Sequence, residues 1–312
     1  MAEIVVVGPA SWNQIVALDA LPEPVPHMEF ARSSHETIGG TSAGKALHLV
    51  ELGRDVLLHT VVGTDDAGGH ITSRLRDAGV PLLLAVTDGP SERHLNLMDR
   101  DGGRVSIYLS LPSDVPARDS RVVAEMAVAR AVVLDLSAHS RALIDDAVAT
   151  GVPIWTDLHD YDGSAEFHRP FLAAASYVFM NADRIGDDPV AFLHEAVGGG
   201  AVLAVCTLGS QGAVAVDANH EVHTVAAVAV ERVVDTNGAG DAFMAGVLAA
   251  TLDGASTPDA LRAGAVQATR ALGSEHLSPL LDQSSTPVGD GVVIGAEASV
   301  VTFGADEVVG RG

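Results

Sequence analysis

Short runs of valine, isoleucine and leucine alternate in this chain with longer stretches in which alanine and leucine recur at helical spacing. Strands that alternate with helices favour a mostly parallel sheet with helices on both faces, a three-layer α/β/α fold. Strands are expected at Ile4–Val7, Val56–Val62, Ala131–Leu136, Val152–Thr156, Tyr177–Met180 and Val202–Thr207. Helices are expected at Ala43–Leu52, Asp66–Ala78, Arg141–Ala149, Ala239–Leu252 and Pro258–Leu272.

Two stretches interrupt this alternation and predict a small second sheet. Leu21–Pro26 is rich in proline and leads into a polar segment that ends at Ile38. Glu92–Leu109 alternates with period two, and Arg100–Gly103 at its centre has the sequence of a hairpin turn. We expect insertions at about residues 14–37 and 82–110 to form a β-sheet lid on the main domain.

The chain has 312 residues, of which 47% are hydrophobic, which is enough for one large α/β domain or two modest ones. We assign residues 1–285 to a single domain. Residues 286–312, rich in serine, threonine and glycine, form a C-terminal extension with candidate edge strands at Val292–Ile294 and Val300–Phe303.

Acidic residues dominate the charge, with 41 Asp+Glu against 18 Lys+Arg and a net charge of -23. Such a surface repels phosphate backbones and anionic membranes. The single cysteine, Cys206, excludes disulfides within the chain and a cysteine-rich zinc site. The N-terminus has no basic region typical of a signal peptide, and no apolar run reaches the ~18 residues of a membrane span. We expect a cytoplasmic protein with no nucleic-acid or membrane partner.

The most informative segment is Asp235-Thr236-Asn237-Gly238-Ala239-Gly240-Asp241, which opens an apolar helix. The small residues Gly238, Ala239 and Gly240 let the backbone approach a ligand, and the free amides of a helix N-terminus favour an anion. Asp241 would repel a phosphate held there unless it accepts a proton, as a base must when a hydroxyl attacks a γ-phosphoryl group. The alternative is that Asp241 only complements the helix dipole.

A second glycine-rich segment, Gly39-Gly40-Thr41-Ser42-Ala43-Gly44-Lys45-Ala46, nearly matches a P-loop. Position 46 lacks the hydroxyl that would bind Mg²⁺, and residues 34–38 do not have the sequence of a buried strand. Lys45, the only lysine of the chain, either recognises a carboxylate or phosphate of a ligand or is a solvated lysine at a helix start.

Acidic side chains also follow two predicted strands. Asp135 stands at the end of one strand and either contacts a substrate or caps the next helix. Asp157–Gly163 is a polar loop after another strand, at the edge of the sheet where α/β proteins bind ligands.

Together these segments resemble the ribokinase-like (PfkB-type) family of carbohydrate and nucleoside kinases over about residues 3–280. The resemblance implies ATP- and Mg²⁺-dependent phosphorylation of a hydroxyl on a sugar or sugar-like molecule. Asp241 would be the base, and the amides of Gly238, Ala239 and Gly240 would form the anion hole. Lid strands in this family often pair between subunits, which implies a homodimer.

The resemblance also assigns binding residues. Asn13, Gly39 and Gly40 would bind the substrate, with Lys45 and Asp135 as further candidates for the same pocket. Asp235 would hold a monovalent cation such as K⁺. The nucleotide site would comprise Asn181 near the phosphates and Thr207, Gly209 and Gly212.

Three positions depart from the family pattern. Gly44 replaces an asparagine and Asn13 replaces an aspartate, both of which contact sugar hydroxyls in the family. Arg184 replaces the glutamate of the Asn-x-x-Glu pattern, beginning here at Asn181, that organises Mg²⁺. Ribose is therefore a poor substrate candidate. The alternatives to a sugar kinase are a nucleoside kinase of the same fold, a catalytically silent sugar or nucleotide sensor, and a P-loop NTPase centred on Lys45.

Overall fold

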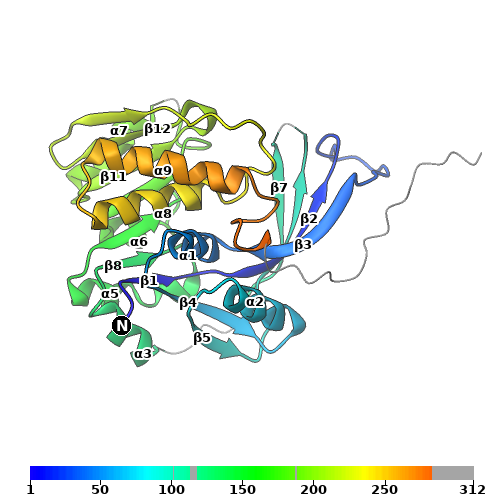
Figure 1. The fold of residues 1–312 in the computed structure, drawn as a ribbon, viewed down its shortest axis with the longest axis horizontal. Coiled ribbons are helices and arrows are strands. Elements are labelled where there is room, and N and C mark those ends of the chain that lie inside the picture. Colours follow the sequence, from blue (N-terminus) through cyan, green and yellow to red (C-terminus); the bar gives the residue numbers. More distant parts are fainter. Residues whose placement is uncertain (101, 113–117, 187, 283–312) are drawn as a thin grey trace, which may run out of the picture.

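A nine-stranded sheet runs through the computed structural model, which describes residues 1–282 except 101, 113–117 and 187 (Figure 1). All neighbours are parallel except the last two strands, which pair antiparallel at one edge. The order across the sheet is β13 (Val222–Val225), β12 (Ala213–Asp217), β11 (Leu203–Thr207), β10 (Tyr177–Asn181), β9 (Ile154–Asp157), β8 (Ala131–Leu134), β1 (Ile4–Val7), β4 (Val56–Gly63) and β5 (Leu82–Thr87).

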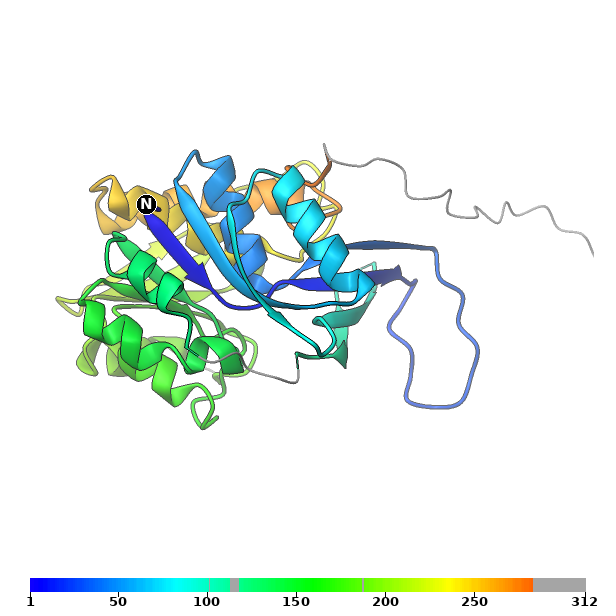
Figure 2. The same cartoon turned by 90° about the horizontal axis from the view of Figure 1, so that it is seen from below.

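Helices cover both faces of this sheet, so the predicted three layers are confirmed (Figure 2). Ile4 and Val6 face one helical layer and Val5 and Val7 the other, which is why the strand reads as an unbroken apolar run. One layer contains α1 (Thr41–Glu51), α2 (Asp66–Asp77), α8 (Ala239–Leu252) and α9 (Thr257–Leu272). The other contains α3 (Ser120–Met126), α5 (Ile144–Thr150), α6 (Arg169–Ala174) and α7 (Pro189–Gly198).

The lid is a separate four-stranded sheet beside the main one, in the order β3 (Ser33–Gly39), β2 (Ser11–Ala17), β6 (Arg93–Met98) and β7 (Arg104–Ser110) (Figure 1). The insertion expected at about 82–110 begins later, because residues 82–87 form β5, whose leucines pair with β4 and pack on the main core. The first pair of lid strands also extends beyond 14–37 at both ends.

The six predicted strands lie within two residues of their expected bounds, whereas β12, the place of β5 in the main sheet, and helices α3, α6 and α7 were not predicted. The helix expected at Arg141–Ala149 is interrupted. A short α4 (Ala138–Arg141), capped by the Ser137 side chain, ends before α5, and the buried Leu143 and Ile144 lie at the junction. The predicted C-terminal extension lies outside the described residues. None of the described helices is long and apolar enough to cross a membrane.

The strand order creates a crevice at one edge of the sheet. From β1 the chain continues through β4 and β5 on one side, and β8 to β11 then extend the sheet on the other. Loops that leave β1 and β8 therefore diverge at the carboxyl ends of these strands, where open α/β sheets bind ligands.

Candidate active site

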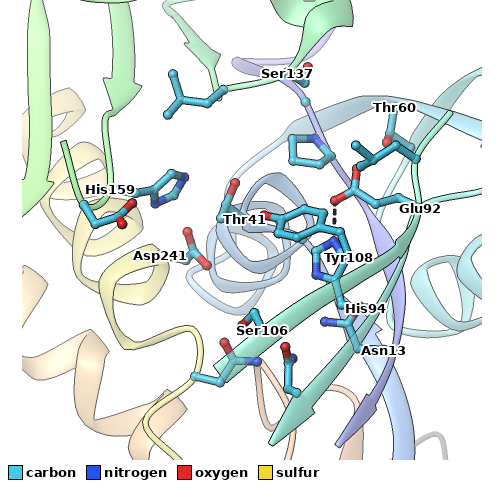
Figure 3. Close-up of a pocket in the computed structure, with 18 of the residues that line it drawn as sticks. Asn13, Thr41, Thr60, Glu92, His94, Ser106, Tyr108, Ser137, His159 and Asp241 are labelled. Carbon is cyan, nitrogen blue, oxygen red and sulfur yellow. Dashed lines mark hydrogen bonds and ion pairs between the residues drawn. The ribbon is translucent and has the colours of Figure 1, made fainter. Parts of the chain in front are cut away.

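A cavity of about 860 Å³ lies at this crevice, between the main sheet and the lid (Figure 3). Gly8 and Pro9 after β1 and Leu136 to His139 after β8 line it. Two further groups of lining residues face each other across it. The transfer floor comprises Gly40 and Thr41 at the start of α1 and Asn237 and Asp241 at the start of α8; the lid wall comprises Asn13, His94, Asn96, Ser106 and Tyr108.

The start of α8 brings the predicted base and anion-hole amides into one helical turn. Gly238 adopts a left-handed conformation with φ 80° and begins the helix, and Asp241, only 7% exposed, lies in the first turn. The first N–H groups of a helix have no partner within it. A Cβ at Gly240 would meet no atom outside this turn within 4 Å, so the turn is open there, but Gly238, Ala239 and Gly240 are not among the residues that line the cavity.

Lys45 is not a solvated lysine, and that interpretation of the sequence is wrong. The residue is 1% exposed, and its Nζ donates to Oδ1 of Asp241 at 2.7 Å. The same ammonium lies 3.0 Å from Oδ1 of Asp135 and 3.4 Å from Oδ2 of Asp157. Lys45 is not among the residues that line the cavity. The P-loop interpretation fails with it, because this ammonium is committed to three carboxylates and α1 follows a partly exposed lid strand.

Asp135 does not cap the next helix and is not among the residues that line the cavity. It is fully buried, its Oδ2 accepts a hydrogen bond from Oγ of Ser42 at 2.6 Å, and α4 is capped by Ser137 instead.

Asp157 ends β9 and accepts the N–H of His159 at 2.9 Å. The polar loop after β9 does reach the cavity, where His159 and Asp160 line it.

Burial and charge oppose each other in this cluster. Burial disfavours the ammonium of Lys45, but Asp135, Asp241 and Asp157 outweigh it and raise the pKa of Lys45. For Asp241, burial raises the pKa of the carboxyl above its ordinary value, and the charge of Lys45 opposes that rise without cancelling it. For Asp157 the effect of burial is outweighed by His159 and Lys45, which lower its pKa.

Two glycines of the N-terminal segment are required by close packing. Gly40 has φ 91°, and a Cβ there would lie 2.5 Å from the carbonyl oxygen of Pro9. A Cβ at Gly44 would lie 2.8 Å from Oδ2 of Asp241, so the carboxylate rests against the backbone of α1. The asparagine that the family pattern has at position 44 does not fit this arrangement.

Of the other predicted substrate residues, Asn13 lines the cavity and accepts a hydrogen bond from Oγ of Ser11 at 2.7 Å. Gly39 packs directly on Asn13, because a Cβ there would lie 2.0 Å from its Nδ2.

The predicted nucleotide residues follow two neighbouring strands. Asn181 ends β10, lines the cavity with Asp183 and accepts the N–H of Asp183 at 3.0 Å. Thr207 ends β11, and Gly209 and Gly212 shape the turn after it. These three residues are not among those that line the cavity.

Asp235, predicted to hold a monovalent cation, lies in the loop before α8. Its Oδ1 accepts the N–H of Asn237 at 2.8 Å and so fixes the conformation of that loop. Arg104 of the lid donates to Oδ1 of Asn237 at 2.8 Å and joins the lid wall to the transfer floor.

Sequence reasoning missed most of the lid wall. His94 bonds Glu92 at 2.9 Å, and its ring lies 4.0 Å from that of Tyr108. Along β6, His94 and Asn96 are buried while the alternating Leu95 and Leu97 are only half buried. This reversal, with polar residues on the more buried face, is the signal that could have revealed a ligand-facing strand.

Known proteins supply the remaining evidence. The family model described as pfkB family carbohydrate kinase matches residues 1–281. The chain belongs to this family. It is 30% identical over 271 residues to the acarbose 7(IV)-phosphotransferase of Actinoplanes sp., which covers 85% of this chain and 90% of that protein. The solved structure of the microbiome-derived acarbose kinase Mak1 matches at 32% identity with a TM-score of 0.78, over 88% of this chain and 93% of that one.

A ribokinase from Giardia lamblia also has a TM-score of 0.78, over 90% of this chain and 96% of its own, but at 19% identity it shows the fold alone. The predicted family, ribokinase-like fold and carbohydrate-kinase class are confirmed.

Proposed function

We propose that this kinase transfers the γ-phosphoryl group of ATP to a hydroxyl of acarbose or a related sugar larger than a pentose, with Asp241 as the base. The observation that carries the proposal is the Asp241 carboxylate, which is held at the first turn of α8 and lines the cavity (Figure 3). Lys45 occupies Oδ1 of this carboxylate, so Oδ2 is the atom that accepts the substrate proton. The amides of Gly238, Ala239 and Gly240 stabilise charge on the transferring phosphoryl group.

The nucleotide extends from the transfer floor past Asn181 to the turn formed by Thr207, Gly209 and Gly212. Kinases of this family use ATP. Mg²⁺ neutralises charge between the phosphates when it is bound. Arg184 replaces a family glutamate, but Asp183 lines the cavity and offers the hard oxygen ligands that Mg²⁺ prefers. Asp235 is the carboxylate that would hold K⁺, beside the loop that opens α8.

Unpartnered polar atoms support a polyhydroxylated substrate. Among the described residues, Oγ1 of Thr41, Oδ1 of Asn96 and both ring nitrogens of His139 are buried without a hydrogen-bond partner, and all three residues line the cavity. Leaving a buried polar group unpaired costs about 1–3 kcal/mol. Sugar hydroxyls, which both donate and accept, would satisfy these groups on three separate elements.

The size of the cavity and the similarity to two acarbose kinases support a substrate larger than ribose. At about 860 Å³ the cavity is in the upper part of the range of ~300–1,000 Å³ that is usual for small-molecule sites. The aromatic rings of His94 and Tyr108, whose centroids lie 4.0 Å apart at a tilt of 50°, support a second candidate, a nucleoside kinase, because a base could pack against one of them.

A turnover screen separates these functions. ADP release is measured with acarbose, maltotriose, ribose and inosine, and the phosphorylated product is identified by mass spectrometry. We expect kcat/KM for acarbose or maltotriose to exceed that for ribose by about 10-fold or more. Turnover of inosine alone would establish the nucleoside kinase. Binding of a sugar without ADP release would establish the silent sensor.

The proposal extends to a homodimer that forms through the lid. Strand β7 is an edge strand of the lid sheet, and its apolar residues Val105, Ile107 and Leu109 are exposed. An exposed apolar edge is a template for pairing with another chain. Sedimentation equilibrium measures the resulting mass.

With a net charge of -23 the chain is proposed to act in the cytoplasm, without nucleic-acid or membrane partners.

A further inference from the structure

Four ionisable side chains meet beneath the transfer floor, each from a different element. Lys45 comes from α1, Asp135 from the end of β8, Asp157 from the end of β9 and Asp241 from the first turn of α8. The ammonium lies 2.7, 3.0 and 3.4 Å from the carboxylates of Asp241, Asp135 and Asp157. One cation therefore serves three buried anions. Of the three carboxylates, only that of Asp241 both accepts a hydrogen bond from the ammonium and lines the cavity.

We infer that Lys45 is a positioning residue for phosphoryl transfer. Its ammonium holds one oxygen of the Asp241 carboxylate and leaves the other oxygen for the substrate hydroxyl. It also provides the counterion without which three buried carboxylates could not remain together. The inference rests on the proposed role of Asp241 as the base. It replaces the sequence hypothesis in which Lys45 binds an anionic ligand.

The adjacent glycine supports this role. The Asp241 carboxylate packs on the backbone of Gly44, where a Cβ would lie 2.8 Å from Oδ2. Gly44 thus provides the space and Lys45 the charge that seat the carboxylate. The two consecutive residues act on the two different oxygens of the same group.

The surroundings of Asp241 set how readily it ionises. The groups that act on it are Lys45 on α1 and Asp157 and His159 at the end of β9, with burial as the largest influence. Asp135 acts through Lys45, and Asp160 and Asp183 line the same cavity. Lys45 favours the carboxylate, whereas burial and Asp157 favour the protonated form. A base that ionises too easily is a poor proton acceptor, so these opposed influences suit general-base catalysis.

The test compares how kcat depends on pH in two variants that act in opposite directions. Lys45→Met removes the cation, so the pKa of Asp241 should rise, and we expect the acid limb of the kcat profile to move up by about one pH unit or more. Loss of the bond that orients Asp241 should in addition lower the pH-independent plateau of kcat by up to about 100-fold, the scale of a lost general base. Asp157→Asn removes a like charge, and its acid limb should move to lower pH.

Binding distinguishes this role from direct ligand recognition. Because Lys45 does not line the cavity, Lys45→Met should change the Kd of acarbose and of a non-hydrolysable ATP analogue by less than about 3-fold, measured by calorimetry. A 10-fold or larger increase for either ligand would restore the sequence hypothesis. An unmoved acid limb in folded Lys45→Met would overturn the inference. If that variant does not fold, Asp157→Asn decides, and an unmoved limb there has the same consequence.

Arg54→Met is the matched control for a purely structural loss. Arg54 is largely buried, pairs with Asp253 and Glu3 and lies after α1, away from the cavity. This variant should lower the Tm without moving the acid limb.

Asp241→Asn separates the two proposals. Full activity in that variant would remove the base and the proposed mechanism, whereas an inactive Asp241→Asn with an unmoved Lys45→Met profile would remove only the role of Lys45.

Discussion

The transfer floor and the lid wall face the same cavity but are held in place by different forces. On the floor, Asp241 is 7% exposed, is bonded to a buried lysine and rests against a glycine backbone. On the lid wall, Tyr108 is 61% exposed and lies on an edge strand, in contact with His94. The buried polar residues of the lid wall, Asn13, His94 and Asn96, are therefore held by the pairing of four strands, whereas Asp241 on the floor is held by a buried charge.

This difference separates two parts of the function. A group that accepts a proton must be held in one orientation, and a buried ion pair provides that. Recognition of a sugar needs several polar groups that a ligand can bridge, and a half-exposed sheet can present them and change them without disturbing the main core. We expect substitutions on the floor to change kcat and substitutions on the lid wall to change KM for the sugar.

Asp241→Asn should have the largest effect on the floor. We expect kcat to fall by roughly 10²- to 10³-fold, because asparagine cannot accept the proton of the attacking hydroxyl. The variant also removes one of three buried carboxylates around Lys45, so the Tm should not fall. Steady-state kinetics and thermal unfolding measure both quantities. A variant that keeps more than half of the normal kcat would remove Asp241 from its role.

The fold and the floor were largely predictable because their signals are local in the sequence. Buried strands of a parallel sheet are continuous apolar runs, as in Ile4–Val7, and the start of α8 is encoded by the consecutive residues 235–241. The burial of Lys45 beside Asp135 was not foreseen, because the partners of both residues are distant in the chain. Asp241 lies 196 residues from Lys45, and no spacing in the sequence reveals that pairing.

The lid wall was hidden for a similar reason. Asn13 and His94 lie opposite each other because the parallel strands β2 and β6 pair directly. Along the chain, however, β3, β4 and β5 separate these two strands. The sequence predicted the hairpin and placed the insertion at about 14–37 in the same lid, but it did not give the register that sets Asn13 beside His94. Residues 82–87 were assigned to the lid because the sequence of a short leucine-rich strand does not indicate which sheet the strand joins.

Gly240→Val should have the next largest effect and tests the anion hole. The added side chain would meet no protein atom within 4 Å, so it fits without a clash and tests whether a phosphate approaches the backbone at this turn. We expect kcat/KM for ATP to fall by roughly 10²-fold, the loss typical of a blocked oxyanion site, with the Tm within about 2 °C of the unmodified protein. Gly69→Val in α2, also open within 4 Å but remote from the cavity, is the matched control and should keep its activity. Loss of activity that parallels unfolding would make Gly240 structural.

Tyr108→Ala should have the smallest effect and tests the lid wall. Tyr108 is more than half exposed and touches His94 in the absence of a ligand, so its removal should leave the Tm nearly unchanged. If its ring covers the bound sugar, KM for the sugar should rise by about 5- to 10-fold, which corresponds to roughly 1.0–1.4 kcal/mol. Both kcat and KM for ATP should stay within about 2-fold, because Asp241 and the anion hole are untouched. Initial-rate kinetics with each substrate varied in turn give these values. If kcat instead fell by about 10-fold or more while KM stayed the same, the comparison would be contradicted, because the lid would then act in the chemical step as the floor does.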